Sequence, residues 1–186
     1  MKFFQCVCLV VVASILVGCK STLRVQSYQA PAAKLRSEGA VFIVVPQDAY
    51  DEPGSGKKCA DTMLEAFRPY ASRLKLSDEV ATLGVHLTNS LARGFTYVLD
   101  TKINRWEEEP TEWTGKPDSL DLEMHLLQTQ DGMVVSATHF DGKSKWATFG
   151  GDHVEHLLKP LADGWVRAMY EGTDFNVATP NNKTKR

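Results

Sequence analysis

Apolar and polar residues follow each other along the chain with the periods that distinguish strands from helices. Residues 40–46 form a continuous apolar run rich in β-branched side chains, which predicts a strand buried on both faces. Residues 95–104 and 120–126 alternate apolar with polar side chains, which predicts half-buried strands, and residues 133–140 are expected to form a further strand that pairs back. The dipeptide at 131–132 is Asp-Gly, a hairpin signal that predicts antiparallel pairing of the last two strands.

Three other segments carry apolar residues at helical spacing. The first covers residues 55–71. The second follows Ser77, which we expect to be its N-cap, and ends before Gly94, a natural C-cap residue. The third follows Asp152, with Glu155 completing a capping box. Each stripe predicts a helix with one buried face.

The order of these elements predicts the fold class. A short strand at 73–76 completes the series β-α-β-α-β-β-β-α, which predicts an α/β two-layer sandwich with a mixed sheet, antiparallel hairpins and about three helices. We expect a single domain over 38–172, a flexible tether over 19–37 and a disordered tail over 173–186. The element order resembles that of the amino-terminal domain of TolB, which implies a similar fold and no particular function.

The amino-terminal segment predicts where the protein resides. A lysine, an apolar run and a small-residue zone make residues 1–18 a signal peptide. Its end, Leu16-Val17-Gly18-Cys19, resembles the lipobox of bacterial lipoproteins, which implies cleavage before Cys19 and acylation of that cysteine. A plain secretory peptide with an incidental cysteine is the alternative. By the same resemblance to bacterial lipoproteins, Lys20 rather than Asp after the cysteine implies transport to the outer membrane, so we expect the membrane to be a partner through the lipid anchor on Cys19.

Composition excludes several classes of function. The chain has 21 basic and 23 acidic residues and a net charge of −2, so nothing in its charge points to nucleic-acid binding. Cys59 is the cysteine left after signal cleavage and acylation of Cys19, so no intramolecular disulfide is expected. The sequence contains no dinucleotide or nucleophile-elbow fingerprint, and we expect no cofactor.

One candidate site is an anion-binding loop at the start of the first predicted helix. Ser55, Gly56 and Lys57 follow a buried strand and open a helix, which is the context of a phosphate-binding nest. A Walker loop is excluded, because Asp51 stands at its first glycine position and Lys58 at its Ser/Thr position. The alternative is a flexible turn between strand and helix.

A second candidate is a metal site at the start of the last predicted helix. His153 and His156 lie three residues apart, so a helix places both imidazoles on neighbouring positions, with Glu155 between them. The zincin motif is absent, and the remaining histidines fall in separate elements. The alternative is a capped and solvated first turn.

A third candidate is a partner-binding surface built from two segments that connect the later elements. Both are polar and contain tryptophans, which are enriched at protein interfaces. A structural loop held by its tryptophans is the alternative. The predicted partner-binding residues are Trp106, Trp113, Lys116, Asp118, Lys145 and Trp146.

The same residues carry a family resemblance. Trp-Thr-Gly-Lys-Pro-Asp at 113–118, together with Lys145-Trp146 and the segment 150–153, resembles a group of uncharacterised bacterial lipoproteins recognised by a W-S-G-K-P-D motif. The chain departs from that motif only at Thr114, which keeps the hydroxyl group. The resemblance implies an envelope location and one small domain, and it implies no reaction.

Taken together, these patterns favour an outer-membrane lipoprotein that acts as a non-enzymatic protein-interaction module of the envelope. The alternative is a periplasmic metal-dependent hydrolase that uses His153, Glu155 and His156.

Overall fold

A computed structural model describes residues 21–109, 116–144 and 153–175 of the chain. These residues form six strands and three helices. The elements are β1 (Thr22–Gln29), β2 (Ala40–Ile43), α2 (Ser55–Phe67), β3 (Arg73–Leu76), α3 (Leu83–Ala92), β4 (Tyr97–Glu107), β5 (Ser119–Gln128), β6 (Val134–Lys143) and α5 (Val154–Glu171).

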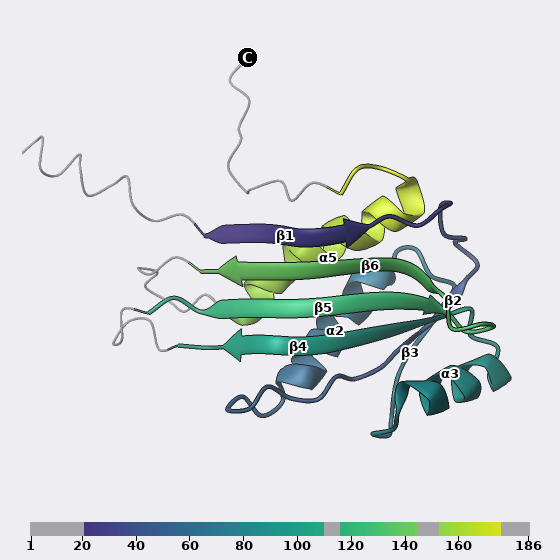
Figure 1. Ribbon diagram of the computed structural model, residues 1–186, viewed down its shortest axis with the longest axis horizontal. Helices are drawn as coiled ribbons and strands as arrows, with labels where there is room; N and C mark the ends of the chain where they lie inside the picture. The colour runs from purple at the N-terminus through teal and green to yellow at the C-terminus, as the bar shows by residue number, and fades with distance from the viewer. Residues whose placement is uncertain (1–20, 110–115, 145–152, 176–186) are drawn as a thin grey trace, which may run out of the picture.

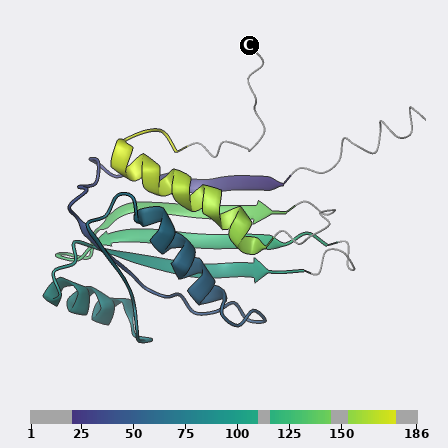
Figure 2. The ribbon, with the colours of Figure 1, turned by 180° about the vertical axis from the view of Figure 1, so that it is seen from behind.

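All six strands join one mixed sheet in the order β1-β6-β5-β4-β2-β3. Strands β2, β3 and β4 are parallel to their neighbours within this group, whereas β4, β5, β6 and β1 pair antiparallel. Helices α2 and α5 lie across one face of the sheet, and α3 lies beside β2 at one corner (Figures 1 and 2). The predicted α/β class and the element order from β2 to α5 are therefore confirmed.

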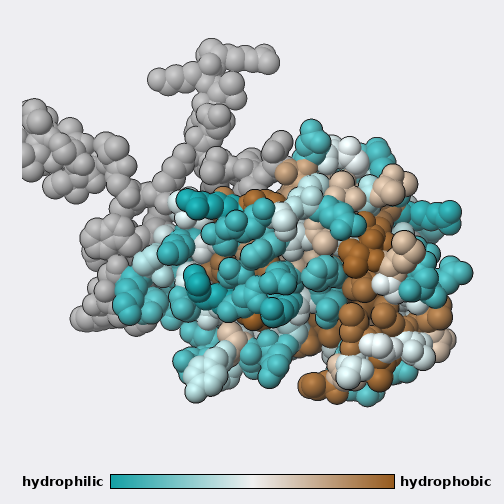
Figure 3. All heavy atoms as spheres, in the orientation of Figure 1, coloured by the Kyte–Doolittle hydropathy of each residue, from teal (hydrophilic) through white to brown (hydrophobic). Residues whose placement is uncertain are grey.

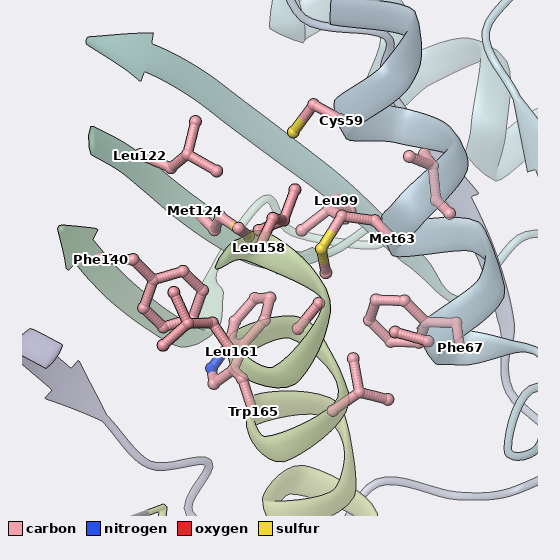
Figure 4. Close-up of a cluster of buried hydrophobic side chains, with 14 of the residues drawn as sticks. Cys59, Met63, Phe67, Leu99, Leu122, Met124, Phe140, Leu158, Leu161 and Trp165 are labelled. Carbon is pink, nitrogen blue, oxygen red and sulfur yellow. The ribbon is translucent and has the colours of Figure 1, made fainter. Parts of the chain in front are cut away.

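The principal core lies between the sheet and the two helices α2 and α5. Figure 4 shows Met63 and Phe67 of α2 and Trp165 of α5 directed toward Leu99 and Phe140 on the strands. All of these side chains are fully buried. Burying an aromatic or aliphatic side chain of this size contributes about 1.5–3 kcal/mol, so this layer supplies most of the hydrophobic stabilisation.

Strand β2 is buried on both faces, as its continuous apolar run predicts. Val41 and Ile43 belong to the principal core, whereas Phe42 lies in a smaller cluster with Phe95 and Val98. Leu83 and Leu87 of α3 pack against this second cluster. The helix therefore covers only one corner of its face of the sheet.

The tether prediction is wrong for residues 22–29, which form edge strand β1 against β6. A bulge between Val25 and Ser27 shifts the register, so Leu23, Val25 and Tyr28 face the core despite their uneven spacing. That bulge breaks the alternation by which a strand is recognised in a sequence. Leu35, also in the predicted tether, is buried, and its N–H donates to the Met169 carbonyl at 3.0 Å.

The predicted tail also begins too early. Phe175 contacts two aromatic rings, with centroid distances of 5.2 Å to Tyr28 and 5.7 Å to Phe140. The ordered domain therefore runs from β1 at least to Phe175, and residues 176–186 lie outside the described part.

The second helix begins later than predicted. It starts at Leu83, with Thr82 as N-cap. Ser77 instead continues the line of β3: its N–H donates to the Ile43 carbonyl, and its hydroxyl oxygen accepts a 2.8 Å hydrogen bond from Val45. The Ser77 hydroxyl is therefore bonded to the segment after β2 and does not cap α3.

The two ends of the sheet differ, and we name them for what lies there. At the loop end, Thr22, Lys143, Ser119 and Glu107 form one row across β1, β6, β5 and β4, and α2 and α5 both begin nearby (Figures 1 and 2). At the hairpin end, the β5–β6 turn lies beside α3. Among the described residues, no helix is both long and apolar enough to cross a bilayer.

Candidate functional site

The predicted anion site at the start of α2 is occupied by the protein itself. The backbone N–H groups of Gly54 and Gly56 each donate a 2.8 Å hydrogen bond to the carboxylate of Asp48. These two bonds lower the pKa of Asp48, so it is an anion at neutral pH. The structure therefore places a carboxylate of the protein itself on two of the amides at which an anion is predicted, while anion binding at Ser55, Gly56 and Lys57 stays a prediction.

The residues of that segment have structural roles. Ser55 is buried, and its hydroxyl oxygen accepts a 2.9 Å hydrogen bond from Ala49. A Cβ on Gly56 would lie 2.1 Å from the Pro46 carbonyl oxygen, so glycine is required by close packing. Lys57 is exposed and pairs with Asp61 one turn along the helix at 2.6 Å.

The loop end instead brings together a group that we call the ionic cluster: Lys58, Glu108, His153 and Glu155. Lys58 lies in the first turn of α2, Glu108 directly follows β4, and the other two lie at the start of α5. The Lys58 ammonium is 2.8 Å from a Glu108 oxygen and 3.6 Å from a Glu155 oxygen. Three elements distant in sequence are thus joined by one cation.

Trp106 supports the ionic cluster from the core side. Its ring is fully packed in the core, and its indole N–H donates to the Glu108 carboxylate at 3.3 Å. The Glu108 N–H donates to the carboxylate of Glu52 at 3.1 Å. Since Trp106 is only 2% exposed, it is an internal support for this segment and not a contact surface for a partner.

The charges of the ionic cluster stabilise one another. Burial raises the pKa of Glu108, but hydrogen bonds from Lys58 and Trp106 outweigh this effect and lower the pKa below its usual value. The hydrogen bond to Glu108 raises the pKa of Lys58. Both groups are therefore charged at neutral pH, and the carboxylate is held by a cation that the protein supplies.

Three members of the ionic cluster have the donor types of a metal site. Ligand atoms of Glu108, His153 and Glu155 all lie within 4.8 Å of one another. One nitrogen and two carboxylates suit Zn²⁺. His156 is not part of this group; its ring lies 5.9 Å from that of His153, centroid to centroid. The structure thus adds Glu108, which follows β4 and carries no spacing signal, to the predicted His153 and Glu155.

The start of β5 is attached to the end of β6 by buried polar contacts. Asp118 is 1% exposed; its N–H donates to the Ser144 hydroxyl at 2.9 Å, and its carboxylate accepts from the Glu109 N–H at 2.8 Å. Lys116 is exposed, and its ammonium lies 3.9 Å from Glu109. Of these two predicted partner-binding residues, only Lys116 has its side chain at the surface.

Four further predicted site residues lie outside the described residues. They are Cys19, Trp113, Lys145 and Trp146. Their described neighbours Glu109, Lys116 and Ser144 all lie at the loop end, next to the row of strand ends.

The open face of the sheet carries a polar network that the sequence analysis did not identify as a group. Asp121 accepts a 3.0 Å hydrogen bond from Asn104 and lies 2.9 Å from His139, while Asn104 also donates to Glu123 at 2.7 Å. Burial raises the pKa of Asp121, but these contacts lower it overall. The period-2 alternation predicts these residues on one face, yet only the register shows which of them touch.

These features define the class of protein: an α/β domain with helices α2 and α5 on one face of a mixed sheet and polar contacts concentrated at the loop end. A family model described as a domain of unknown function (DUF4823) matches residues 33–169, and the chain belongs to this family. No curated protein sequence matches the chain.

Solved structures share the fold at low sequence identity. A PelC dodecamer from Paraburkholderia phytofirmans is similar with a TM-score of 0.65 and 13% identity, over 83% of this chain and 99% of that one. Protein XCC0632 from Xanthomonas campestris, of family DUF330, is similar with a TM-score of 0.48 and 14% identity, over 77% of this chain and 95% of that one. TolB from Acinetobacter baumannii is similar with a TM-score of 0.41 and 11% identity, over 82% of this chain and 32% of that one. At these identities, the PelC likeness establishes a common fold and no shared function.

Proposed function

We propose that this protein is an outer-membrane lipoprotein whose α/β domain serves the bacterial envelope as a non-enzymatic interaction module. The observation that carries the proposal is the join between the lipobox and the domain. Cys19 ends a lipobox-like sequence, and only Lys20 and Ser21 separate it from β1. The folded domain therefore begins directly at the residue that we propose to be acylated.

The chemistry of the described loop end supports an interaction role. Asp48 accepts hydrogen bonds from the amides of Gly54 and Gly56 at the start of α2, and Lys58 forms ion pairs with both Glu108 and Glu155. A general acid or base needs a carboxylate or imidazole that can exchange a proton with substrate near neutral pH. Glu108 instead has a lowered pKa and a fixed ion-pair partner, so it suits a structural ion pair better than proton transfer.

The contact residues that we propose are Lys116 together with Trp113, Lys145 and Trp146, which adjoin the loop end in the chain. Trp106 and Asp118 support this region from inside, since both are buried. PelC, which shares the fold, was solved as a dodecamer. A further copy of this chain is therefore one class of partner that an experiment must be able to detect.

Photo-crosslinking in living cells tests the interaction role. A photoreactive residue replaces Trp113, and a matched variant carries it at Met133, which is 65% exposed at the hairpin end. We expect one discrete adduct from position 113, identified by mass spectrometry, and none of the same mass from position 133. Diffuse adducts from both positions, in protein that is folded and localised, would contradict an interaction role at the loop end.

A separate experiment tests the lipid anchor. Wild-type protein should incorporate labelled palmitate and float with outer-membrane fractions, whereas a Cys19→Ser variant should do neither. Incorporation without outer-membrane fractionation would leave the lipoprotein assignment intact and contradict the destination inferred from Lys20.

The metal-ligand geometry supports a second candidate, a periplasmic metal-dependent hydrolase that uses Glu108, His153 and Glu155. The supporting observation is the convergence of three ligand atoms within 4.8 Å. A bound Zn²⁺ would activate water as a nucleophile. Elemental analysis of protein purified without a histidine tag decides this point: about one zinc per chain favours the hydrolase, and a metal content well below that removes it.

A further inference from the structure

We propose that the loop end of the sheet rests on the lipid headgroup surface that holds Cys19, with the hairpin end pointing away from the membrane. This inference rests on the acylation of Cys19 proposed above. The occupant of the surface is the bilayer itself, contacted through headgroup phosphates and amines.

The first argument is the length of chain between anchor and fold. Three peptide steps join Cys19 to Thr22, and each extended residue spans at most about 3.6 Å, so the two Cα atoms lie within about 11 Å of each other. Thr22 opens β1, whose pairing with β6 fixes it to the sheet. A tether long enough to hold the domain clear of the membrane is therefore absent between these two residues.

The second argument is the register of the strands. Thr22 pairs with Lys143, Lys143 with Ser119, and Ser119 with Glu107, so four strand ends lie in one row. Neighbouring strands are about 4.8 Å apart, which makes this row about 14 Å wide. Anchoring Thr22 close to the lipid therefore brings the whole row close to it, together with the starts of α2 and α5 (Figure 2).

The third argument is the chemistry of the two ends. At the loop end, Lys57, Lys116, Lys143 and Glu107 are exposed, and Lys57 and Lys116 pair with the carboxylates of Asp61 and Glu109. Mixed ammonium and carboxylate groups match the phosphates and amines of phospholipid headgroups. The acyl chains on Cys19 supply the hydrophobic binding, so the protein surface need not insert apolar side chains.

The hairpin end exposes more apolar side chains than the described part of the loop end, where Tyr50, shortly before α2, is exposed. The exposed apolar side chains of the hairpin end include Val85 and Leu91 of α3 and Met133 and Val134 of the β5–β6 hairpin. Figure 3 shows apolar surface gathered on this side of the open face, while the half toward the loop end is mostly hydrophilic. The β6 strand spans about 30 Å between the two ends, at about 3.3 Å per residue. In the proposed orientation, the apolar side chains therefore point into the periplasm.

One consequence concerns the partner. A protein reached from the loop end must itself lie in or at the membrane, because the space beyond that end is lipid. The orientation thus narrows the proposed interaction module to membrane-associated partners on its anchored side.

Fluorescence quenching by lipid measures this orientation. The acylated protein, purified from membranes, carries a thiol-reactive dye at Lys143→Cys or at Met133→Cys and is reconstituted into phosphatidylethanolamine/phosphatidylglycerol vesicles containing a headgroup nitroxide. The native Cys59 is fully buried, and burial raises the pKa of its thiol to about 12, so it takes up no dye. The dye therefore reports only the introduced position.

We expect quenching at position 143 to exceed that at position 133 at least about threefold, since the strand separates the two sites by about 30 Å. Equal quenching at both positions would overturn the proposal, because the sheet would then lie flat or turn freely. A variant with sixteen Gly and Ser residues inserted between Lys20 and Ser21 should lose most of the quenching at 143. Undiminished quenching in that variant would contradict the short connection as the cause.

The outcomes separate this inference from the proposed function. Wild-type protein that does not float with vesicles shows that the chain is not anchored, and both proposals then fail. Protein that floats but gives equal quenching retains its lipid anchor, and only the orientation is wrong.

Discussion

The loop end and the hairpin end of the same sheet are stabilised by different forces. At the loop end, one buried indole supports a group of ion pairs: Trp106 contacts Glu108, which binds Lys58. At the hairpin end, a small apolar cluster around Phe42 and Phe95 joins α3 to the sheet, and apolar side chains remain exposed. The loop end is thus held by directional polar interactions, and the hairpin end by non-directional apolar contacts.

The two kinds of interaction have different consequences for the elements that they join. Hydrogen bonds and ion pairs fix the geometry of the elements that they join, because each needs a specific distance and angle. Apolar contacts stabilise in proportion to the area that they bury and tolerate repacking. The loop end is therefore suited to present neighbouring segments in one arrangement, whereas the hairpin end is suited to bury additional apolar area against another surface.

The largest expected effect comes from removing the aromatic support at each end. Trp106→Ala should lower the free energy of unfolding by about 3–5 kcal/mol, because it leaves a large cavity under the ionic cluster. Phe95→Ala should cost nearer to about 3 kcal/mol, since its cluster of five residues borders solvent and can collapse. Urea unfolding measures both. A greater loss for Phe95→Ala would reverse the comparison.

The next effect tests the internal anion of α2. Asp48→Ala should cost about 0.5–2 kcal/mol, the range for losing a side chain that caps helix amides. The folded pKa of Asp48 is below its usual value of 3.8, so its contribution is present above that pH and is lost as the pH falls through the lower folded pKa. Urea unfolding of wild type and variant at a series of pH values should show the two stabilities converging as the pH falls below 3.8.

A matched control is Asp51→Ala, an exposed carboxylate of the same segment. It should change stability by less than about 0.5 kcal/mol. The Asp48→Ala variant should also gain weak affinity for inorganic phosphate, because its helix amides become available. An Asp48→Ala variant as stable as wild type would show that water replaces the carboxylate at no cost.

The sequence predicts most of this fold because the responsible signals are local. The run at 40–46, the alternation along β4 and β5, the Asp-Gly turn before β6 and the stripe of α5 are each signals within one element or one turn. Strand β1 was not predicted, because its bulge breaks the period and its pairing partner β6 lies more than a hundred residues away. The start of α3 was predicted too early because Ser77 donates its N–H to Ile43 of β2 and its hydroxyl oxygen accepts from Val45, so it does not cap a helix.

The site was predictable only in part, for a related reason. The sequence places His153 and Glu155 close together in the chain, but residues two apart do not share a helix face. They meet because His153 is the N-cap of α5, with an extended backbone. Glu108 and Lys58 join them only through tertiary packing, which no spacing encodes. The sequence analysis of the anion loop did not include Asp48, a carboxylate six residues before Gly54 that accepts a hydrogen bond from its amide. An acidic residue shortly before a glycine-opened helix is the signal that indicates such an occupied nest.

A smaller effect is expected when the cation of the ionic cluster is removed. Lys58→Met should cost about 1 kcal/mol or less, because its side chain is 41% exposed and solvent screens the ion pairs. The same change leaves Glu108 and Glu155 without their cation, so zinc affinity measured by calorimetry should rise. Lys57→Met is the matched control, since its ion pair with Asp61 lies outside the ionic cluster. Equal zinc affinity in both variants would show that Lys58 does not compete with metal.

The smallest effect on stability is expected at the exposed part of the hairpin end. Met133 is 65% exposed, so Met133→Ser should change the free energy of unfolding by less than about 0.5 kcal/mol. Urea unfolding at low protein concentration measures this term. If the exposed apolar side chains bury area against another copy or a partner, the same variant should weaken that complex, as seen by sedimentation velocity. A loss of unfolding free energy above about 1 kcal/mol in dilute monomer would show that Met133 packs internally. The hairpin end would then not offer Met133 as exposed apolar surface, and its contrast with the polar loop end would be wrong.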